Sequence, residues 1–143
     1  MFITNAEKVR GYVVRKKGAK GVRVKYLLHK GVGAKHLQLG LFTIDVGGYT
    51  PLERHEHEHE VYVLRGKVSV RGGESEVIAR TGNVMFISSN EEHQFRNIDK
   101  ESVEFLCTKQ TESKLIGRLM ADRDISEETV ESNLQLNRIG LSF

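Results

Sequence analysis

The chain has 143 residues, which suits one domain with a single hydrophobic core and leaves little room for two. With 38% hydrophobic and 29% charged residues, its composition is that of a globular protein and not of a disordered one. No apolar run approaches the roughly 20 residues that a membrane-spanning helix needs, and the single cysteine, Cys107, excludes an internal disulfide.

The net charge of +3 is unevenly distributed, because residues 1–36 carry +9 whereas residues 37–98 and 99–143 carry −3 each. The basic stretch 15–20 has little aromatic interleaving and matches no known nucleic-acid reader, so we expect nucleic acid not to be the partner. We expect a solvated basic edge that faces the acidic C-terminal part of a second copy, in a homodimer. The first ten residues contain no apolar signal-peptide core, which predicts a cytoplasmic protein that does not associate with membranes.

The predicted elements between residues 22 and 108 are short strands separated by turns that contain glycine, asparagine or serine. Valine and isoleucine dominate these segments, as is typical of strands, and Gly66 and Gly72 mark turns between them. Many short strands at regular spacing predict an all-β fold, an antiparallel barrel or sandwich. The predicted strands are 22–26, 37–44, 61–64, 68–70, 75–79, 84–87 and 103–108.

The C-terminal part has a different pattern. Leu115, Ile116, Leu119 and Met120 recur at helical spacing, and residues 124–128 have the acids of a helix start. We therefore expect one or two short helices there. The whole is one domain, with basic N-terminal strands (1–36) that complete the barrel or a dimer, a barrel core (37–110) and a helical extension (111–143).

Three of the six histidines lie in the stretch 53–60, which reads Glu-Arg-His-Glu-His-Glu-His-Glu. A solvated charged edge and a weak, accidental metal-binding tract are two alternatives to a built metal site. The stretch also contains H-E-x-x-H, the zinc-protease pattern, which functions only on a helix. It follows Pro51 and continues into the strand and turn of residues 61–70, so the helical reading is disfavoured.

On an extended chain, residues 53, 55, 57 and 59 face the same side, and Val61 and Val63 continue that side as apolar core. The imidazole and carboxylate groups are therefore predicted to point inward. Such a cluster is costly to bury unless it is paired or binds a metal, and these groups are ligands that divalent transition metals accept. His29 and His36 lie outside this pattern and are expected to be ordinary surface or strand histidines.

A second stretch, residues 82–97, supplies a further ligand, His93. In the first stretch, five residues separate Gly47 from Glu53 and one separates Glu53 from His55. Three residues then separate His55 from His59, and six separate His59 from Gly66. This spacing resembles the first motif of the cupin family, and the second motif is matched at Gly82, Ser88, Asn90, His93 and Asn97.

The resemblance implies a jelly-roll barrel, of the single-domain cupin type 2, that holds one divalent metal with Glu53, His55, His59 and His93. Glu53 stands where the family has its first histidine, and His59 stands where it has its glutamate, which leaves three histidines and one carboxylate. Asn90 replaces a turn glycine, and asparagine tolerates left-handed backbone well. His57 has no family counterpart and is interpreted as a residue of the pocket mouth or an alternative ligand.

The family catalyses many reactions, so the resemblance implies a metal centre and not one reaction. We expect a metal-dependent oxidoreductase of dioxygenase type that acts on a small organic substrate, with manganese or iron favoured and zinc or nickel as alternatives. A non-catalytic small-molecule binder or sensor and a sugar-type isomerase are the other hypotheses. No catalytic residue is assigned, and the weak candidates are Tyr49, Tyr62, Glu91 and Glu92, with Phe42, Phe86 and Phe95 as residues that could line the cavity. Arg54, Arg65 and Arg96 have the wrong parity to bind a phosphate inside the barrel.

Overall fold

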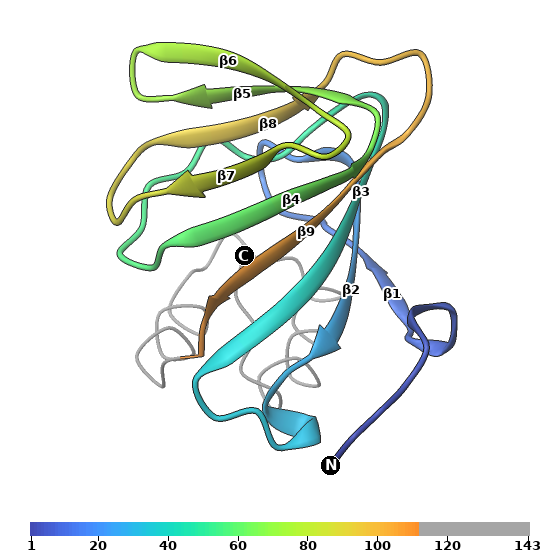
Figure 1. Ribbon diagram of the computed structural model, residues 1–143. Coiled ribbons are helices and arrows are strands. Elements are labelled where there is room, and N and C mark those ends of the chain that lie inside the picture. Colours follow the sequence, from blue (N-terminus) through green and yellow to red (C-terminus); the bar gives the residue numbers. More distant parts are fainter. Residues whose placement is uncertain (112–143) are drawn as a thin grey trace.

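A computed structural model describes residues 1–111, and the helices expected after residue 111 lie outside the described residues. Antiparallel strands curl into a barrel-like jelly roll, which confirms the predicted all-β fold (Figure 1). None of the helices in the described part of the chain is long and apolar enough to cross a membrane. Two single turns of 3-10 helix, η1 (Ala6–Lys8) and η2 (Lys30–Val32), accompany the strands β1 (Gly11–Val13), β2 (Lys20–Leu28), β3 (Leu37–Tyr49), β4 (His59–Arg65), β5 (Lys67–Gly72), β6 (Ser75–Arg80), β7 (Val84–Ile87), β8 (His93–Asn97) and β9 (Val103–Gln110).

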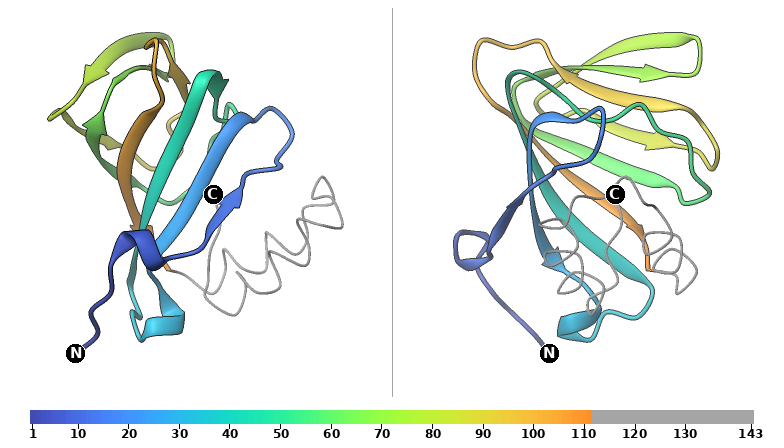
Figure 2. Two further views of the ribbon diagram at one scale, coloured as in Figure 1. Left: turned by 90° about the vertical axis from the view of Figure 1, so that its right-hand side faces the viewer. Right: turned by 180° about the vertical axis from the view of Figure 1, so that it is seen from behind.

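The strands follow the order β6-β5-β8-β3-β9-β4-β7, with β2 on β3 and β1 on β2. The long strand β3 joins the two parts of the sheet, because its first eight residues pair with β9 while its last residue, Tyr49, pairs with Arg96 of β8. The views in Figure 2 show how this curvature brings β4, β7 and β8 around one interior. Strands far apart in sequence therefore contribute side chains to a common interior.

Alternating burial along each strand defines the core, as the period of two requires. Fully buried side chains fill one end of the interior, among them Val22, Ile44, Val63, Val68 and Val103. The inward rows of β4 and β9 change from apolar to polar along their length, whereas the inward row of β8 has Phe95 between His93 and Asn97. The polar ends of these rows carry His59 on β4 and His93 on β8.

Candidate metal centre

Three of the predicted ligands, His55, His59 and His93, come together at the polar end of the interior. One ring nitrogen from each lies within 4.8 Å of the others. His59 and His93 are the first residues of β4 and β8, whereas His55 lies in the segment that precedes β4. We call these three residues the histidine cluster.

Backbone hydrogen bonds hold the two motifs together at the histidine cluster. The amide of Glu53 donates to the carbonyl of His93 (3.0 Å), and the amide of His93 donates back to Glu53 (2.8 Å). The amide of Asn90 also donates to the carbonyl of His55 (2.7 Å), from a left-handed backbone conformation with φ of 61°. The asparagine at the family's glycine position therefore preserves the turn, as the sequence predicted.

The hydrogen bonds of the rings leave their Nε2 atoms available as ligands. The Nδ1 of His55 donates to the carbonyl of His57 (3.1 Å), and the Nδ1 of His93 donates to the carbonyl of Glu91 (2.8 Å). A carbonyl can only accept, so Nδ1 carries a proton, and in the neutral form of such a ring the lone pair lies on Nε2. Metal-binding histidines commonly have such a backbone partner, which fixes the ring and the tautomer.

His59, the third histidine of the cluster, has a sulfur atom beside its Nδ1 in place of a carbonyl. The Nδ1 of His59 lies 3.1 Å from the Sγ of Cys107, and its Nε2 lies 3.2 Å from the Nε2 of His55. Burial raises the pKa of the Cys107 thiol to about 12, so the sulfur is a neutral thiol that packs against the ring. Two imidazole nitrogens that face each other this closely call for a cation or a proton between them.

Burial keeps the histidine cluster in the form that binds metals. It lowers the pKa of His55 to about 4 and that of His59 to about 2, with a further lowering from neighbouring histidines. Both rings are therefore neutral at physiological pH, and a neutral imidazole is the form that coordinates a metal. The donor type, the tautomers and the convergence of the three rings fit a divalent transition metal.

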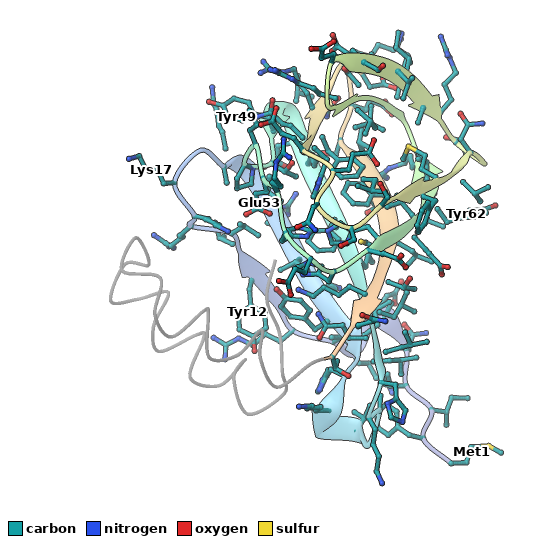
Figure 3. All side chains as sticks on the ribbon, turned by 90° about the vertical axis from the view of Figure 1, so that its left-hand side faces the viewer. Met1, Tyr12, Lys17, Tyr49, Glu53 and Tyr62 are labelled. Atoms are coloured by element: carbon teal, nitrogen blue, oxygen red, sulfur yellow. The ribbon has the colours of Figure 1, made fainter. Side chains whose placement is uncertain are left out.

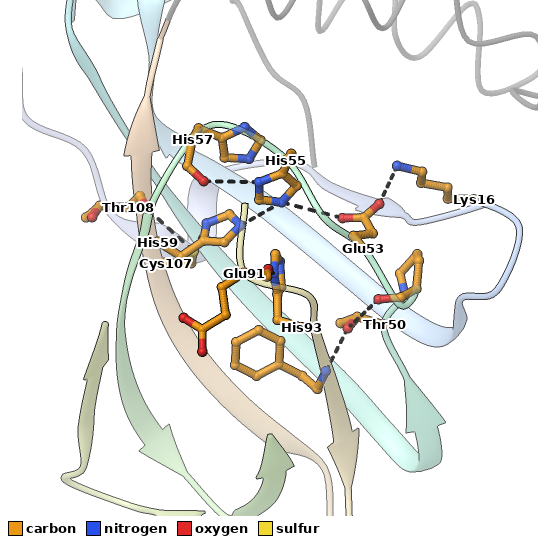
Figure 4. A network of polar contacts seen from close by, with 12 residues as sticks. Lys16, Thr50, Glu53, His55, His57, His59, Glu91, His93, Cys107 and Thr108 are labelled. Atoms are coloured by element: carbon orange, nitrogen blue, oxygen red, sulfur yellow. Dashed lines mark hydrogen bonds and ion pairs between the residues drawn. The ribbon is translucent and has the colours of Figure 1, made fainter. Parts of the chain in front are cut away.

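Glu53, the fourth predicted ligand, lies beside the histidine cluster and also contacts a cation. One carboxylate oxygen lies 3.8 Å from the Nε2 of His55, and the other forms an ion pair with the Nζ of Lys16. Figure 4 shows Lys16 reaching this carboxylate from the segment between β1 and β2. The basic N-terminal segment therefore supplies the cation that pairs with Glu53.

His57 is buried, although the sequence placed it at the pocket mouth. Its residue exposure is 4% and its ring stacks on that of His55 with centroids 3.5 Å apart (Figure 4). Within residues 1–111, neither of its ring nitrogens has a hydrogen-bond partner. Burial and the nearby charge of Lys109 lower the pKa of His57, so the ring is neutral. An unsatisfied buried imidazole costs roughly 1–3 kcal/mol.

A pocket opens beside His59 and His93 and continues into the barrel. It contains about 430 Å³ of space free of atoms, its open side included. Phe42 and Phe95 line it, as the sequence had suggested, whereas Phe86 is 59% exposed and lies elsewhere. The remaining lining residues are Tyr26, Gln38, Gly40, Phe105, Cys107 and Lys109.

The weak candidates for acid–base roles lie outside this pocket. Tyr62 is 46% exposed and points away from the barrel (Figure 3), and Tyr49 packs against the guanidinium of Arg96. The carboxylate of Glu91 accepts hydrogen bonds from Ser88, which lower its pKa. Arg54, Arg65 and Arg96 are exposed, as their parity predicted.

Sequence reasoning missed the polar side chains that come from other segments of the chain. Lys16, Gln38 and Lys109 belong to neither motif, yet Lys16 pairs with Glu53 and the other two line the pocket. The available signal was the inward parity of Gln38 within the predicted strand 37–44 and of Lys109 directly after the predicted strand 103–108, at positions where apolar residues are the rule.

Comparison with known proteins places this chain in a family. A family model for the cupin domain matches residues 40–109. The chain is 29% identical to the polyketide cyclase RemF from Streptomyces resistomycificus, with a TM-score of 0.74 and coverage of 78% of this chain and 80% of that one. A cupin-2 domain protein from Rhodospirillum rubrum shares the fold, with a TM-score of 0.68 at 24% identity over 94% of this chain and 93% of its own.

A curated relative, the 1-methylthio-D-xylulose 5-phosphate methylsulfurylase of Rhodospirillum rubrum, is 32% identical over 101 residues. That match covers 71% of this chain but only 58% of the length of the relative. Three observations support the same assignment: the matched family model, the curled antiparallel sheet and the histidine cluster. The chain belongs to the cupin superfamily.

Proposed function

We propose that this protein is a metal-dependent enzyme, an oxidoreductase of dioxygenase type, that converts a small organic substrate held in the pocket. The observation that carries the proposal is the convergence of three histidines, each ring held through a contact of its Nδ1, beside a pocket that reaches the core. A bound manganese or iron ion would supply Lewis-acid and redox chemistry. The rings of His59 and His93 line the pocket, so a substrate there lies next to the proposed ligands.

Glu53 is proposed as the fourth ligand. Its carboxylate already lies beside the Nε2 of His55, and it would supply the negative charge that three neutral imidazoles lack. In the described structure Lys16 neutralises that charge. We infer that Lys16 and the metal compete for Glu53, so the lysine lowers the affinity of the metal while it keeps the carboxylate compensated when no metal is bound.

A non-catalytic binder that uses its metal to capture a ligand is the second candidate. The polar residues of the pocket other than histidine favour it, because Gln38 and Lys109 are groups suited to binding while Glu91 and Glu92 do not line the pocket. An isomerase of sugar phosphates has less support, since Arg54, Arg65 and Arg96 face outward.

Oxygen uptake separates the enzyme from the binder. Protein purified without added metal is analysed for its elements, then loaded with Fe²⁺ or Mn²⁺ and screened for O₂ consumption with small organic acids, ketones and phenols. Metal-dependent uptake that is absent from the His93→Ala variant would support the oxidoreductase. Tight zinc binding and no turnover with any substrate class would favour the binder.

We also propose a homodimer of this chain. The edge strands β6 and β7 end the strand order and each leaves one side unpaired among the described residues, and such edges are normally covered. The basic segment 1–36 and the acidic segment 99–143 provide opposite charges for a contact between copies. Light scattering at micromolar concentration and moderate salt should give the mass of two chains, whereas a monomer would rule the dimer out.

A further inference from the structure

The partner of His59 differs in kind from the partners of the other two rings of the histidine cluster. His55 and His93 each direct Nδ1 at a backbone carbonyl, which can only accept a hydrogen bond. His59 directs Nδ1 at the Sγ of Cys107, 3.1 Å away, and a thiol can both donate and accept. The direction of the hydrogen bond at His59 is therefore not fixed by its immediate partner.

A chain of hydrogen bonds that starts at a backbone carbonyl fixes this direction instead. The Nδ1 of His55 donates to the carbonyl of His57, so the neutral ring of His55 has only a lone pair on Nε2. That lone pair faces the Nε2 of His59 at 3.2 Å, so the Nε2 of His59 has to donate. The neutral ring of His59 then has a lone pair on Nδ1, and the thiol of Cys107 has to donate to it.

The thiol of Cys107 also has a second acceptor within reach. Its Sγ lies 3.6 Å from the carbonyl of Thr108, and a hydrogen bond between the ring of His59 and the backbone of Thr108 partly offsets the effect of burial on the pKa of His59. Cys107 is buried, and burial raises the pKa of its thiol to about 12, so the sulfur keeps its proton. Rotation about the Cβ–Sγ bond is enough to turn that proton from His59 to Thr108.

The sulfur of Cys107 is not among the converging ligand atoms. Within residues 1–111, the candidate ligand atoms that lie within 4.8 Å of one another belong to the three histidines. Cys107 contacts the Nδ1 of His59, whereas the Nε2 of the same ring faces His55 (Figure 4). The thiol is therefore placed to act on the metal centre through His59.

We propose that Cys107 is the positioning residue of His59 and that its thiol reverses its hydrogen bonds when a metal binds. Without a metal, the S–H donates to Nδ1, and the Nε2–H of His59 donates to His55. With a metal on Nε2, the ring proton lies on Nδ1 and donates to the sulfur, while the S–H donates to Thr108. A carbonyl in place of the thiol would permit only the second arrangement, because it cannot donate.

The reversal changes no charge on either group. The proton that leaves Nε2 goes to solvent and Nδ1 takes one from solvent, so the ring and the thiol each keep one proton. A partner that fixes the tautomer of a ligating histidine is worth about tenfold to a hundredfold in metal affinity. The second arrangement rests on the proposed function, because it needs a metal at the histidine cluster, whereas the first does not.

The test reads the tautomer of each ring from two-bond proton–nitrogen correlation spectra, recorded on isotope-labelled protein that is either treated with a chelator or loaded with Zn²⁺. In the chelator-treated protein His59 should be the Nε2–H tautomer, whereas His55 and His93 should be Nδ1–H. With Zn²⁺, His59 should become Nδ1–H. The inference would be overturned by Nδ1–H at His59 in the chelator-treated wild type, or by a zinc complex in which His59 keeps its proton on Nε2.

Two substitutions separate hydrogen bonding from packing. Cys107→Ser keeps a group that donates and accepts, so its tautomers and its affinity for Zn²⁺ should be close to those of the wild type. Cys107→Ala removes the partner of Nδ1, and its affinity should fall at least roughly tenfold. Val63→Ala, the matched control, removes buried volume from β4 and none of these hydrogen bonds, so it should leave both properties unchanged. Equal affinity in the wild type and Cys107→Ala, or an equal loss in both Cys107 variants, would contradict the inference.

A further measurement distinguishes a positioning residue from a ligand. A thiolate-to-metal charge-transfer band in the Co²⁺-loaded wild type that is absent from Cys107→Ser would make the sulfur a ligand and overturn the inference. Protein that takes up no metal would refute the proposed function, and the tautomer of His59 in the chelator-treated wild type would then decide the role of Cys107 by itself. Metal uptake by a protein whose His59 is Nδ1–H without a metal would refute this inference and leave the proposed function standing.

Discussion

The two ends of the barrel interior are built by the same strands but differ in chemistry. On β4 the inward residues run from His59 through Val61 to Val63, and on β9 they run from Lys109 through Cys107 and Phe105 to Val103. At one end buried aliphatic side chains pack against one another. At the other, buried imidazoles, an amide and a lysine converge, which by themselves lower the stability of the fold.

The two ends of the interior therefore have different roles, because one stabilises the fold and the other carries the candidate site. Burial of apolar surface at the valine-rich end stabilises the barrel by roughly 25 cal/mol per Å² of surface removed from water. The polar end retains groups that favour a ligand over stability, and His57 is the clearest case because both its ring nitrogens lack hydrogen bonds in the described part of the chain. Substitutions at the apolar end should therefore lower the stability of the fold and leave metal binding unchanged. Substitutions at the polar end should instead alter metal binding or, where they remove an unsatisfied polar group, raise the stability.

The largest effect on stability is expected at the apolar end. Ile44 is completely buried, and Ile44→Ala should lower the free energy of unfolding by about 2–5 kcal/mol through lost burial and a cavity. Because Ile44 lies outside the histidine cluster, metal stoichiometry at a temperature where the variant is folded should not change. Chemical denaturation measures the free energy of unfolding, and elemental analysis measures the metal stoichiometry. A loss of metal by the folded variant would contradict the separation of roles between the two ends.

Glu53 tests whether the carboxylate is a ligand or only the partner of Lys16. Glu53→Gln should weaken metal binding at least roughly tenfold, about 1.4 kcal/mol, because a neutral amide is the poorer donor. Glu53→His should retain the metal, since it restores a donor at that place in the motif. Competition titrations with a chelator measure the affinities.

Lys16→Met is the matched variant for this comparison. It frees the Glu53 carboxylate from its cation, so the metal should bind more tightly than to the wild type. Equal metal affinity in the wild type and Glu53→Gln would reduce the site to its three histidines.

A smaller effect, of opposite sign, is expected at His57. His57→Phe removes two unsatisfied buried nitrogens and keeps a flat ring against His55, so the metal-free protein should be more stable by about 1 kcal/mol. Metal affinity should change little. Thermal unfolding and the chelator titration are the measurements, and a clear loss of metal would make His57 a ligand.

The sequence predicted the features that local spacing determines. Strand parity and motif spacing placed His55, His59 and His93 around one point, and the strand pattern predicted the antiparallel barrel. Inward burial also alternates through residues 53–59, although β4 begins only at His59. The expected metal is consistent with the cluster, and the roles of the individual ligands stay predictions.

The features that depend on pairing between distant strands were not predictable from these patterns. The lining of the pocket depends on the register of β3 and β9, which sets Gln38 opposite Lys109, 71 positions later in the chain. The Lys16–Glu53 ion pair depends on where the segment before β2 runs in the folded chain. Phe86 is a different case: it was expected near the cavity as an aromatic strand residue, although the alternation along β7, a local property, directs it outward. Local periodicity determines which side of a strand a residue occupies, whereas its neighbours depend on register.

Metal content per chain tests the central claim most directly. Wild-type protein, His59→Ala, His93→Ala and the exposed control His36→Ala are purified without added metal and with a defined supply of manganese and iron, and each is analysed for its elements. We predict about one divalent ion per chain in the wild type and His36→Ala, and a loss of most of it in the other two variants. Full metal content in His59→Ala and His93→Ala, or none in the wild type under both conditions, would contradict it.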